Sequence, residues 1–234
     1  VYKIMTLLEA IKQRHSVRRY VHKPLSAEIV ETLRKKIEEC NAEGGLHIQL
    51  VTNETRAFTG LFSYGKFSGV ENYIVMVGKK ADDLDERVGY YGEQLVLLAQ
   101  TLGLNTCWAG LSYRRVDEAY SVGDDEKLTC MIALGYGATQ GHKRKSKTAE
   151  QVSNISSDSP EWFRNGVEAA LLAPTAINQQ KFSFTLLPNE QDTEDKPKVL
   201  AKRGFSMVGY TKMDIGIARL HFEIGAGTEN FDWA

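Results

Sequence analysis

The sequence predicts a mixed fold, of the α+β or α/β class, on the strength of two observations. Segments in which apolar residues recur every three or four positions alternate with segments in which they recur every second position, so helices and strands interleave along the chain. Of the 234 residues, 42% are hydrophobic and 25% are charged, which provides both a sizeable core and a solvated surface. Disordered, collagen-like and fibrous proteins are therefore excluded.

The first part of the chain is expected to hold four helices and three strands. The opening helix ends in a basic run, and Ser26 is a plausible N-cap for the second helix, which Gly44 and Gly45 stop. A third helix is apolar nearly all round, as expected for a central helix enclosed by protein. In order, we expect a helix ending near residue 13, a helix over 26–44, strands over 46–51 and 72–77, a helix over 88–102, a short polar helix over 116–120 and a strand over 128–134.

A second part starts at Ser159 and Pro160, and we divide the chain into residues 1–155 and 156–234, which together form one globular unit. The expected elements are a helix over 161–173, a strand over 182–186 and a helix over 213–224. The helix, turn and strand at residues 29–51 resemble those at 161–187, which is consistent with a degenerate internal duplication. Two unrelated helix and strand units would give the same pattern, so the sequence leaves both explanations open.

Charge and hydropathy restrict the class of protein further. The 29 Lys and Arg residues nearly cancel the 30 Asp and Glu residues, for a net charge of −1, which argues against dedicated nucleic-acid binding. No run approaches the roughly 18 consecutive apolar residues of a membrane span, and the first residues do not resemble a signal peptide. We therefore expect a soluble, cytoplasmic protein without a membrane partner. Cys40, Cys107 and Cys130 are expected to be buried free thiols rather than disulfides or metal ligands.

A basic run at residues 14–20, Arg-His-Ser-Val-Arg-Arg-Tyr, is the first candidate for chemistry. Three guanidiniums, an imidazole and a hydroxyl lie within seven residues after a helix, and such a cluster can neutralise a phosphate. The alternative is a solvated helix end, at which cations complement the helix dipole.

Two further clusters suit a polar heterocycle. Residues 173–180, Ala-Pro-Thr-Ala-Ile-Asn-Gln-Gln, offer amides and a hydroxyl on a backbone that proline restricts, although an ordinary loop after a helix looks the same. At residues 102–111, Trp108 lies between small residues and could pack on a ligand ring. Trp108 is equally typical of a core residue, and Cys107 of a small buried hydrophobe.

The tract at residues 142–147, His-Lys-Arg-Lys-Ser-Lys, is a local anion site or a solvated connector, because it stands alone in a neutral chain. The preceding glycines have the spacing G-x-G-x-x-x-G and no apolar helix follows them, so we reject a dinucleotide fingerprint. The Walker, H-E-x-x-H, G-x-S-x-G and Cys-x-x-Cys motifs are absent from the sequence, and no metal site is expected.

Taken in order, these pieces resemble the flavin-dependent nitroreductase family. Its N-terminal pattern R-[RH]-S-x-R-x-[FY] is similar to residues 14–20, and its pattern L-G-L-G-T-C-W is similar to residues 102–108. Its loop P-S-[SA]-x-N-x-Q is similar to residues 174–180, and its closing strand with G-Y and a basic segment is similar to residues 135–147. The resemblance implies an α+β nitroreductase-like sandwich, in which helices flank a mixed or antiparallel central sheet.

The order of the motifs departs from that of typical members, where the proline loop follows closely behind the arginine motif. Here residues 40–45 occupy that position, and the loop lies near residue 174. This order is similar to a subgroup in which the chain is duplicated. Typical members are homodimers with FMN at the interface, so two fused halves would keep the arginine motif in the first half and the loop in the second. The resemblance then implies one FMN per chain in a monomeric pseudo-dimer, or in a homodimer formed through other surfaces.

The resemblance also implies roles for particular residues. The FMN phosphate is expected on Arg14 and Arg18, with Lys145 or Lys147 closing the site. Ser16 or His15 is expected to bind the ribityl chain or a ring carbonyl. In the second half, the flavin is expected to contact Pro174, Thr175, Ala176 and Asn178. In the first half, it is expected to pack on Cys107, Trp108, Ala109 and Gly110. The loop at residues 62–70 is expected to close over the substrate face.

The function implied is an FMN-dependent oxidoreductase, with no catalytic side chain beyond the flavin itself. NADH or NADPH would reduce the flavin, which would reduce a nitroaromatic, a quinone or a similar small acceptor in ping-pong order. One alternative is a flavin-binding protein without turnover, for storage or sensing, and another is a structural or nucleic-acid-binding domain that uses the basic tract. Reductive dehalogenation and oxidative flavin chemistry also remain open within the enzyme class.

Overall fold

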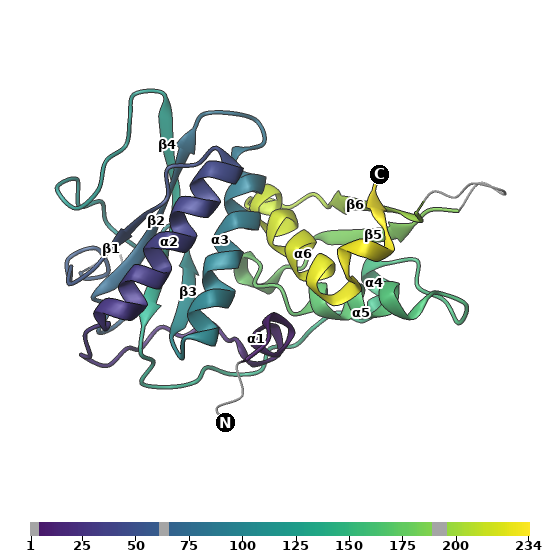
Figure 1. Cartoon of the computed structure of the whole chain (residues 1–234), viewed down its shortest axis with the longest axis horizontal. Coiled ribbons are helices and arrows are strands. Elements are labelled where there is room, and N and C mark those ends of the chain that lie inside the picture. Colours follow the sequence, from purple (N-terminus) through teal and green to yellow (C-terminus); the bar gives the residue numbers. More distant parts are fainter. Residues whose placement is uncertain (1–4, 61–65, 189–195) are drawn as a thin grey trace.

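The computed structural model describes residues 5–60, 66–188 and 196–234, in which two sheets flank a central pair of helices (Figure 1). The first sheet is antiparallel throughout and has the order β1-β2-β4-β3. This part of the chain holds three helices and four strands in the described residues. In chain order they are α1 (Leu7–Gln13), α2 (Ala27–Gly44), β1 (Gln49–Val51), β2 (Asn72–Lys79), α3 (Leu84–Thr101), β3 (Asn105–Ala109) and β4 (Glu126–Gly135).

The second sheet is smaller and has the order β5-β6-β7, with β5 and β6 antiparallel and β6 and β7 parallel. A short 3-10 helix, Ala176–Asn178, follows α5, and another, Thr228–Asn230, precedes β7. The elements are α4 (Ala149–Val152), α5 (Glu161–Leu171), β5 (Phe182–Leu186), β6 (Lys198–Arg203), α6 (Thr211–Ala226) and β7 (Asp232–Trp233).

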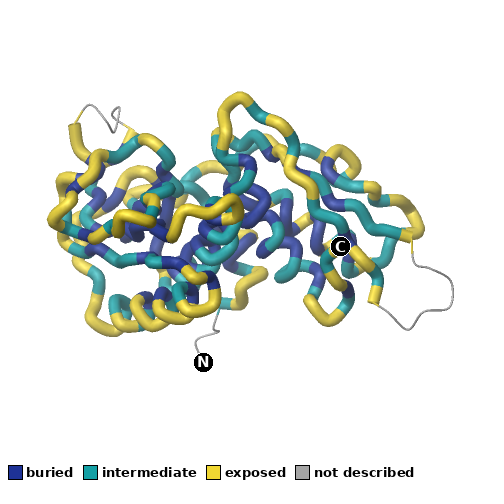
Figure 2. Tube along the Cα trace, turned by 90° about the horizontal axis from the view of Figure 1, so that it is seen from above, coloured by how far each residue is buried: buried dark blue, intermediate teal, exposed yellow. Residues whose placement is uncertain are grey.

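The helices α3 and α6 lie side by side in the middle of the molecule (Figure 1). Gly89 of α3 lies directly against the carbonyl of Met213, and Gly216 of α6 lies against the carbonyl of Glu86, so the two backbones touch where the helices cross. One continuous apolar core includes Leu95 from the first part and both Phe163 and Phe222 from the second. Figure 2 shows the buried segments running through this middle region, with exposed segments around it. The two sheets therefore belong to one packed unit.

The ends of α2 follow the sequence signals. The Ser26 hydroxyl accepts a hydrogen bond from the Ile29 amide at 3.3 Å, which caps the first turn. The helix stops at Gly45, which has a φ of 57°, a left-handed conformation that glycine adopts without steric cost.

Most of the expected elements are confirmed, and the antiparallel pairing decides for α+β against α/β. The expected helix over residues 116–120 is wrong: these residues form turns, and Val116 and Tyr120 are buried in the cluster beneath the first sheet. Residues 105–109, expected only as a buried segment, form β3. The strands β6 and β7 were not predicted, because β6 alternates weakly and β7 has only two residues.

The three cysteines are free and buried, as expected. Among the described residues, no group of three or more His, Cys, Asp or Glu residues could hold a metal ion. No helix in these ranges combines the length and apolar character that crossing a membrane requires.

Candidate cofactor site

Two neighbouring cavities form one cleft between the parts of the chain that carry the two sheets. The first, which we call the apolar cavity, has a volume of about 360 Å³ and lies between the end of β3, the loop after α5 and the start of α6. The second, the basic cavity, has a volume of about 430 Å³ and lies between the end of α1, residues 142–146 and the end of α5. Both are lined by Ser16, Arg18, Thr175 and Ile177, so they adjoin each other.

The basic cavity gathers cations from two distant segments of the chain. None of its lining residues is acidic, and its charged or titratable members are Lys12, Arg14, His15, Arg18, His142, Lys143 and Arg144. Partial burial and the charges of Arg14 and Arg144 lower the pKa of His15. Burial and then the charge of Arg14 lower the pKa of Arg144 to about 10, while its Nη2 donates to the Ala173 carbonyl at 2.7 Å. An anion in this cavity would relieve the mutual repulsion.

Arg14 is the buried member of this set, with 5% of its surface exposed. Burial lowers the pKa of its guanidinium, and the carboxylate of Glu93, 3.8 Å from its Nε, opposes that effect. The Nε atom is buried and has no hydrogen-bond partner. Because a buried donor without a partner is costly, the position fits a ligand that brings acceptor oxygens, such as a phosphate.

The loop after α5 is held in an unusual backbone conformation. Ile177 and Asn178 have φ values of 47° and 58°, in the left-handed region that non-glycine residues rarely adopt. Asp214 of α6 fixes the loop, because its Oδ1 accepts from the Ala176 amide at 3.0 Å and its Oδ2 accepts from Gln179 Nε2 at 2.7 Å. Burial raises the pKa of Asp214 to about 6, against the opposing effect of these hydrogen bonds. Asn178 Oδ1 is buried and unpaired, which leaves an acceptor at the cleft.

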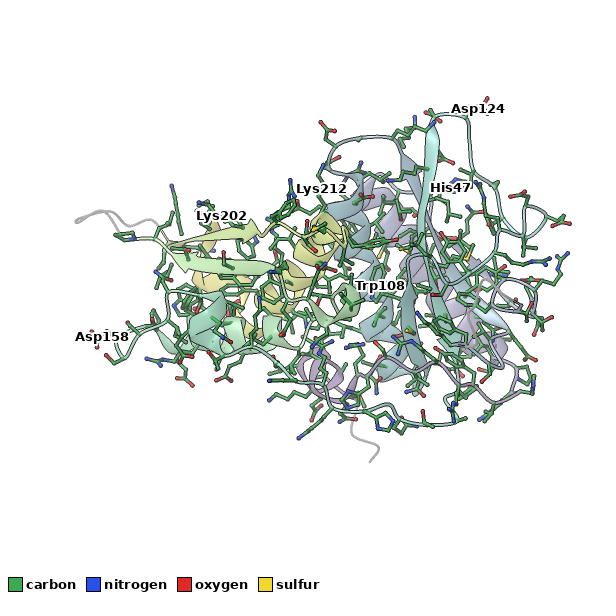
Figure 3. All side chains as sticks on the ribbon, turned by 180° about the vertical axis from the view of Figure 1, so that it is seen from behind. His47, Trp108, Asp124, Asp158, Lys202 and Lys212 are labelled. Atoms are coloured by element: carbon green, nitrogen blue, oxygen red, sulfur yellow. The ribbon has the colours of Figure 1, made fainter. Side chains whose placement is uncertain are left out.

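The apolar cavity is lined on one side by Trp108, Ala109 and Gly110 and on the other by Tyr210 and Met213. Trp108, on β3 of the first sheet, lies near the middle of the molecule (Figure 3). Its indole Nε1 donates to Glu93 Oε2 at 2.9 Å, which fixes the ring. A side chain at Gly110 would collide with the Tyr210 hydroxyl and ring, so the glycine allows Tyr210 to pack closely against this end of the first sheet.

The cleft brings together most of the residues that the sequence singled out. Those lining it are Arg14, His15, Ser16, Arg18, Trp108, Ala109, Gly110, Pro174, Thr175, Ala176 and Asn178. Three other candidates line neither cavity. Cys107 is buried, which raises the pKa of its thiol. Lys145 contributes its carbonyl to Asn178 Nδ2, and Lys147 donates to the Gln180 carbonyl at 2.6 Å.

Within the loop at residues 62–70, positions 62–65 lie outside the described residues, while Lys66 and Phe67 line the apolar cavity. Glu93, Tyr210 and Asp214 were not predicted as site residues, and Arg144 was predicted only as a member of the basic tract, in which Lys145 or Lys147 was expected to bind the phosphate. Glu93 and Asp214 could have been found as acidic residues within apolar helical stretches, a pattern that predicts a buried, paired carboxylate. Tyr210 carries no such signal, and Arg144 is indistinguishable in sequence from its basic neighbours.

Fold and cleft together define a mixed α+β protein whose cleft suits a compound with an anionic end and a flat, largely apolar end. Residues 6–226 match the family described as "Putative TM nitroreductase", and the chain belongs to this nitroreductase family. Membership confirms the resemblance seen in the sequence and assigns the chain to a family of oxidoreductases.

Solved structures agree on the fold. A "putative nitroreductase" from Thermotoga maritima MSB8 is 22% identical and superposes with a TM-score of 0.63, covering 96% of this chain and 85% of that one. A "putative nitroreductase in complex with FMN" from Desulfovibrio desulfuricans is 17% identical, with a TM-score of 0.51 over 66% of this chain and 98% of that one. Nitroreductase A from Vibrio parahaemolyticus is 16% identical, with a TM-score of 0.52 over 66% of this chain and 78% of that one. No curated protein sequence matches the chain.

Proposed function

We propose that the chain is an FMN-dependent oxidoreductase with FMN in the cleft between its two parts. The observation that carries the proposal is the pairing of two cavities. One is basic and is lined by Arg14, whose buried Nε has no hydrogen-bond partner among the described residues, and the other is apolar and is bordered by Trp108. The family and the FMN held by the Desulfovibrio protein support the same cofactor.

Different residues of the cleft would bind different parts of FMN. Arg14 and Arg18 would bind the phosphate. Arg144 would be the third cation, in place of Lys145 or Lys147, because Arg144 lines the basic cavity and the two lysines do not. Ser16 and Thr175 line both cavities, where a ribityl chain would pass between them. Trp108 and Pro174 would border the ring, and Asn178 would offer its free carbonyl oxygen.

When bound, FMN supplies two-electron chemistry, in which NADH or NADPH delivers a hydride and a nitroaromatic, quinone or similar acceptor removes it. The chain contributes an open, apolar entrance for that acceptor. Leu111, Ile177 and Val208 line the apolar cavity yet are 77%, 79% and 45% exposed. Phe205 and Met207 lie on the same loop as Val208 and are also exposed. An apolar rim of this kind suits a flat apolar acceptor.

The first experiment records the visible spectrum of the purified chain with added FMN and then titrates it anaerobically with NADH and with NADPH. Bleaching of the flavin by either nucleotide, followed by recovery when a quinone or nitroaromatic is added, supports the enzyme. Binding without bleaching supports the alternative of a flavin-binding protein without turnover. A chain that takes up no FMN overturns the proposal.

A further inference from the structure

The carboxylate of Glu93 connects the separate pieces of the cleft. It is fully buried on α3. Its Oε2 accepts from the Trp108 indole at 2.9 Å, beside the apolar cavity, and its Oε1 lies 3.8 Å from Arg14 Nε, beside the basic cavity. Oε1 also pairs with Nε2 of the fully buried His221 of α6 at 2.9 Å. One side chain therefore reaches both ends of the cleft and the opposite part of the molecule.

The hydrogen bonds of His221 fix the position of the Glu93 carboxyl group. Its Nδ1 lies 3.1 Å from the Ala169 carbonyl, and its Nε2 faces Glu93. A carbonyl only accepts, so the Nδ1 of His221 donates to Ala169, and its Nε2 is left to meet the Glu93 carboxyl group. The same carboxyl group accepts from the Trp108 N–H and lies beside the Arg14 guanidinium. Through Ala169, His221 also ties Glu93 to α5, two residues before the end of the helix that leads to Pro174.

The crossing of α3 and α6 itself does not require this pair. Gly89 and Gly216 are each the sixth residue of their helices and make matching backbone contacts across the crossing. The tenth and eleventh positions are Glu93 and Gln94 on α3, and Leu220 and His221 on α6. If the two helices are exchanged, the positions of Glu93 and His221 become those of Leu220 and Gln94. These two residues carry no charge. At this pair of equivalent positions, a glutamate and a histidine therefore meet on the side of the crossing that faces Arg14 and Trp108, and uncharged residues occupy the other side.

We propose that Glu93 is a positioning residue of the FMN site, which holds the Arg14 guanidinium for the phosphate and Trp108 beside the ring. The assignment rests on the proposed function, because it takes FMN as the ligand. In the absence of phosphate, Glu93 supplies the nearby countercharge that keeps Arg14 charged while buried. An outer partner of this kind acts through the residue it orients, and losing it typically weakens ion binding by roughly tenfold or more.

Glu93→Gln is the decisive variant, because it can keep every hydrogen bond while removing the charge. The Gln carbonyl would accept from Trp108, and its amide would donate to a neutral His221. Dissociation constants of the full chain are measured for FMN and for riboflavin, which lacks the phosphate. We expect the preference for FMN over riboflavin to fall by roughly tenfold or more. An unchanged preference, or equal weakening of both ligands, would overturn the proposal.

The matched control is Glu86→Gln, which breaks the 2.7 Å ion pair with Arg219 across the same two helices, away from the cleft. It is expected to leave the preference unchanged. Arg14→Ala should lower the preference by itself, and adding Glu93→Gln to it should lower it no further, whereas independent losses would contradict the proposal. If Glu93→Gln does not fold, Glu93→Asp keeps the charge but withdraws it from Arg14, with the same expected direction. A wild-type chain that binds neither flavin overturns the proposed function itself, which separates the two failures.

Discussion

Asp214 is a carboxyl group whose burial is only partly compensated. It is 3% exposed, accepts two hydrogen bonds from the loop after α5, and has no cation among its hydrogen-bond or ion-pair partners. Its pKa of about 6, against an ordinary value of 3.8, means that the folded chain holds this proton more tightly than the unfolded chain. The stability that follows is present at low pH and is lost as the pH rises through 6.

Asp214→Asn should therefore stabilise the chain at neutral pH. The new amide can still accept from the Ala176 amide, and it can donate to the Gln179 Oε1, which is buried and unpaired in the wild type. From a shift of about two units, the expected gain above pH 7 is at most roughly 3 kcal/mol, and it should vanish near pH 4.

Thermal unfolding of both proteins from pH 4 to pH 8 measures this difference. Asp158→Asn, on an exposed turn, serves as the control and should show no such trend. A difference between wild type and Asp214→Asn that does not grow with pH would show that Asp214 is not protonated in the folded chain near pH 5.

At the site, local sequence patterns single out some of the residues that line the cleft and not others. Arg14 and Asn178 were predicted because each lies in a local run of residues with a common chemistry. Glu93 and Asp214 were missed because each acts alone, from a helix, on a segment far away in the chain. A local pattern can indicate that such a carboxylate is buried and paired, but the identity of its partners depends on how α3 and α6 pack.

Among the elements, the 3-10 turn Ala176–Asn178 carries the clearest strain. Ile177 is β-branched, has a φ of 47° and is 79% exposed at the rim of the apolar cavity. Its left-handed backbone costs about 1–2 kcal/mol relative to a glycine there, and no burial of its side chain offsets that cost. Strain at the mouth of a cleft is typical of a functional position, and here the side chain would contact the acceptor.

Two variants at this position separate strain from contact. Ile177→Ala and Ile177→Gly both remove the apolar side chain and should raise KM for an apolar acceptor to a similar extent. The Gly variant should be more stable than the Ala variant by about 1 kcal/mol, the reverse of their order inside a helix. Steady-state kinetics and urea unfolding measure the two effects, and an Ala variant as stable as the Gly variant would show that the backbone at residue 177 is not strained.

Element prediction depended on length and on periodicity. The long helices α2, α3 and α6 were predicted because each presents several turns of apolar residues. The polar residues 116–120 have a helical composition, but tertiary contacts fix Val116 and Tyr120 beneath the first sheet in a turn. In β6 only Val199 is buried and the other residues are half-buried or exposed, so strand alternation is faint.

For the whole molecule, the order of elements repeats. α1, α2, β1, β2, α3 and β3 correspond to α4, α5, β5, β6, α6 and β7, with β4 as an addition to the first series. The directions of the strands agree as well. β3 runs parallel to β2, because both are antiparallel to the intervening β4, and β7 runs parallel to β6. This repetition supports the predicted duplication, with α3 and α6 as the central pair.

The central crossing gives a direct test of that symmetry. Gly89→Ala and Gly216→Ala would each push a methyl group into the backbone of the other helix. On an exposed helix, glycine to alanine is stabilising by up to about 1 kcal/mol, whereas here each change should destabilise by about 3 kcal/mol or more. Chemical unfolding should show similar losses for the two variants. A large loss in one and none in the other would contradict an equivalent role.

The same symmetry predicts one flavin per chain. Asp83, Glu86, Arg87 and Tyr90 of the first series occupy the positions of four residues that line the apolar cavity, Tyr210, Met213, Asp214 and Ile217. They line a cavity of about 460 Å³ on the other side of the crossing, whose charged groups already pair internally: Glu86 with Arg219 at 2.7 Å, and Glu223 with the Tyr90 hydroxyl at 2.6 Å.

After α4, the segment that corresponds to the arginine run is Ser-Asn-Ile-Ser-Ser-Asp, without a cation to hold a phosphate. We therefore expect the concentration of FMN released by heat to equal the concentration of the chain. In sedimentation analysis, the monomer should carry the bound FMN. Two flavins per chain, or flavin bound only by a dimer, would contradict the fused-half arrangement, because a single chain would then not hold one complete site.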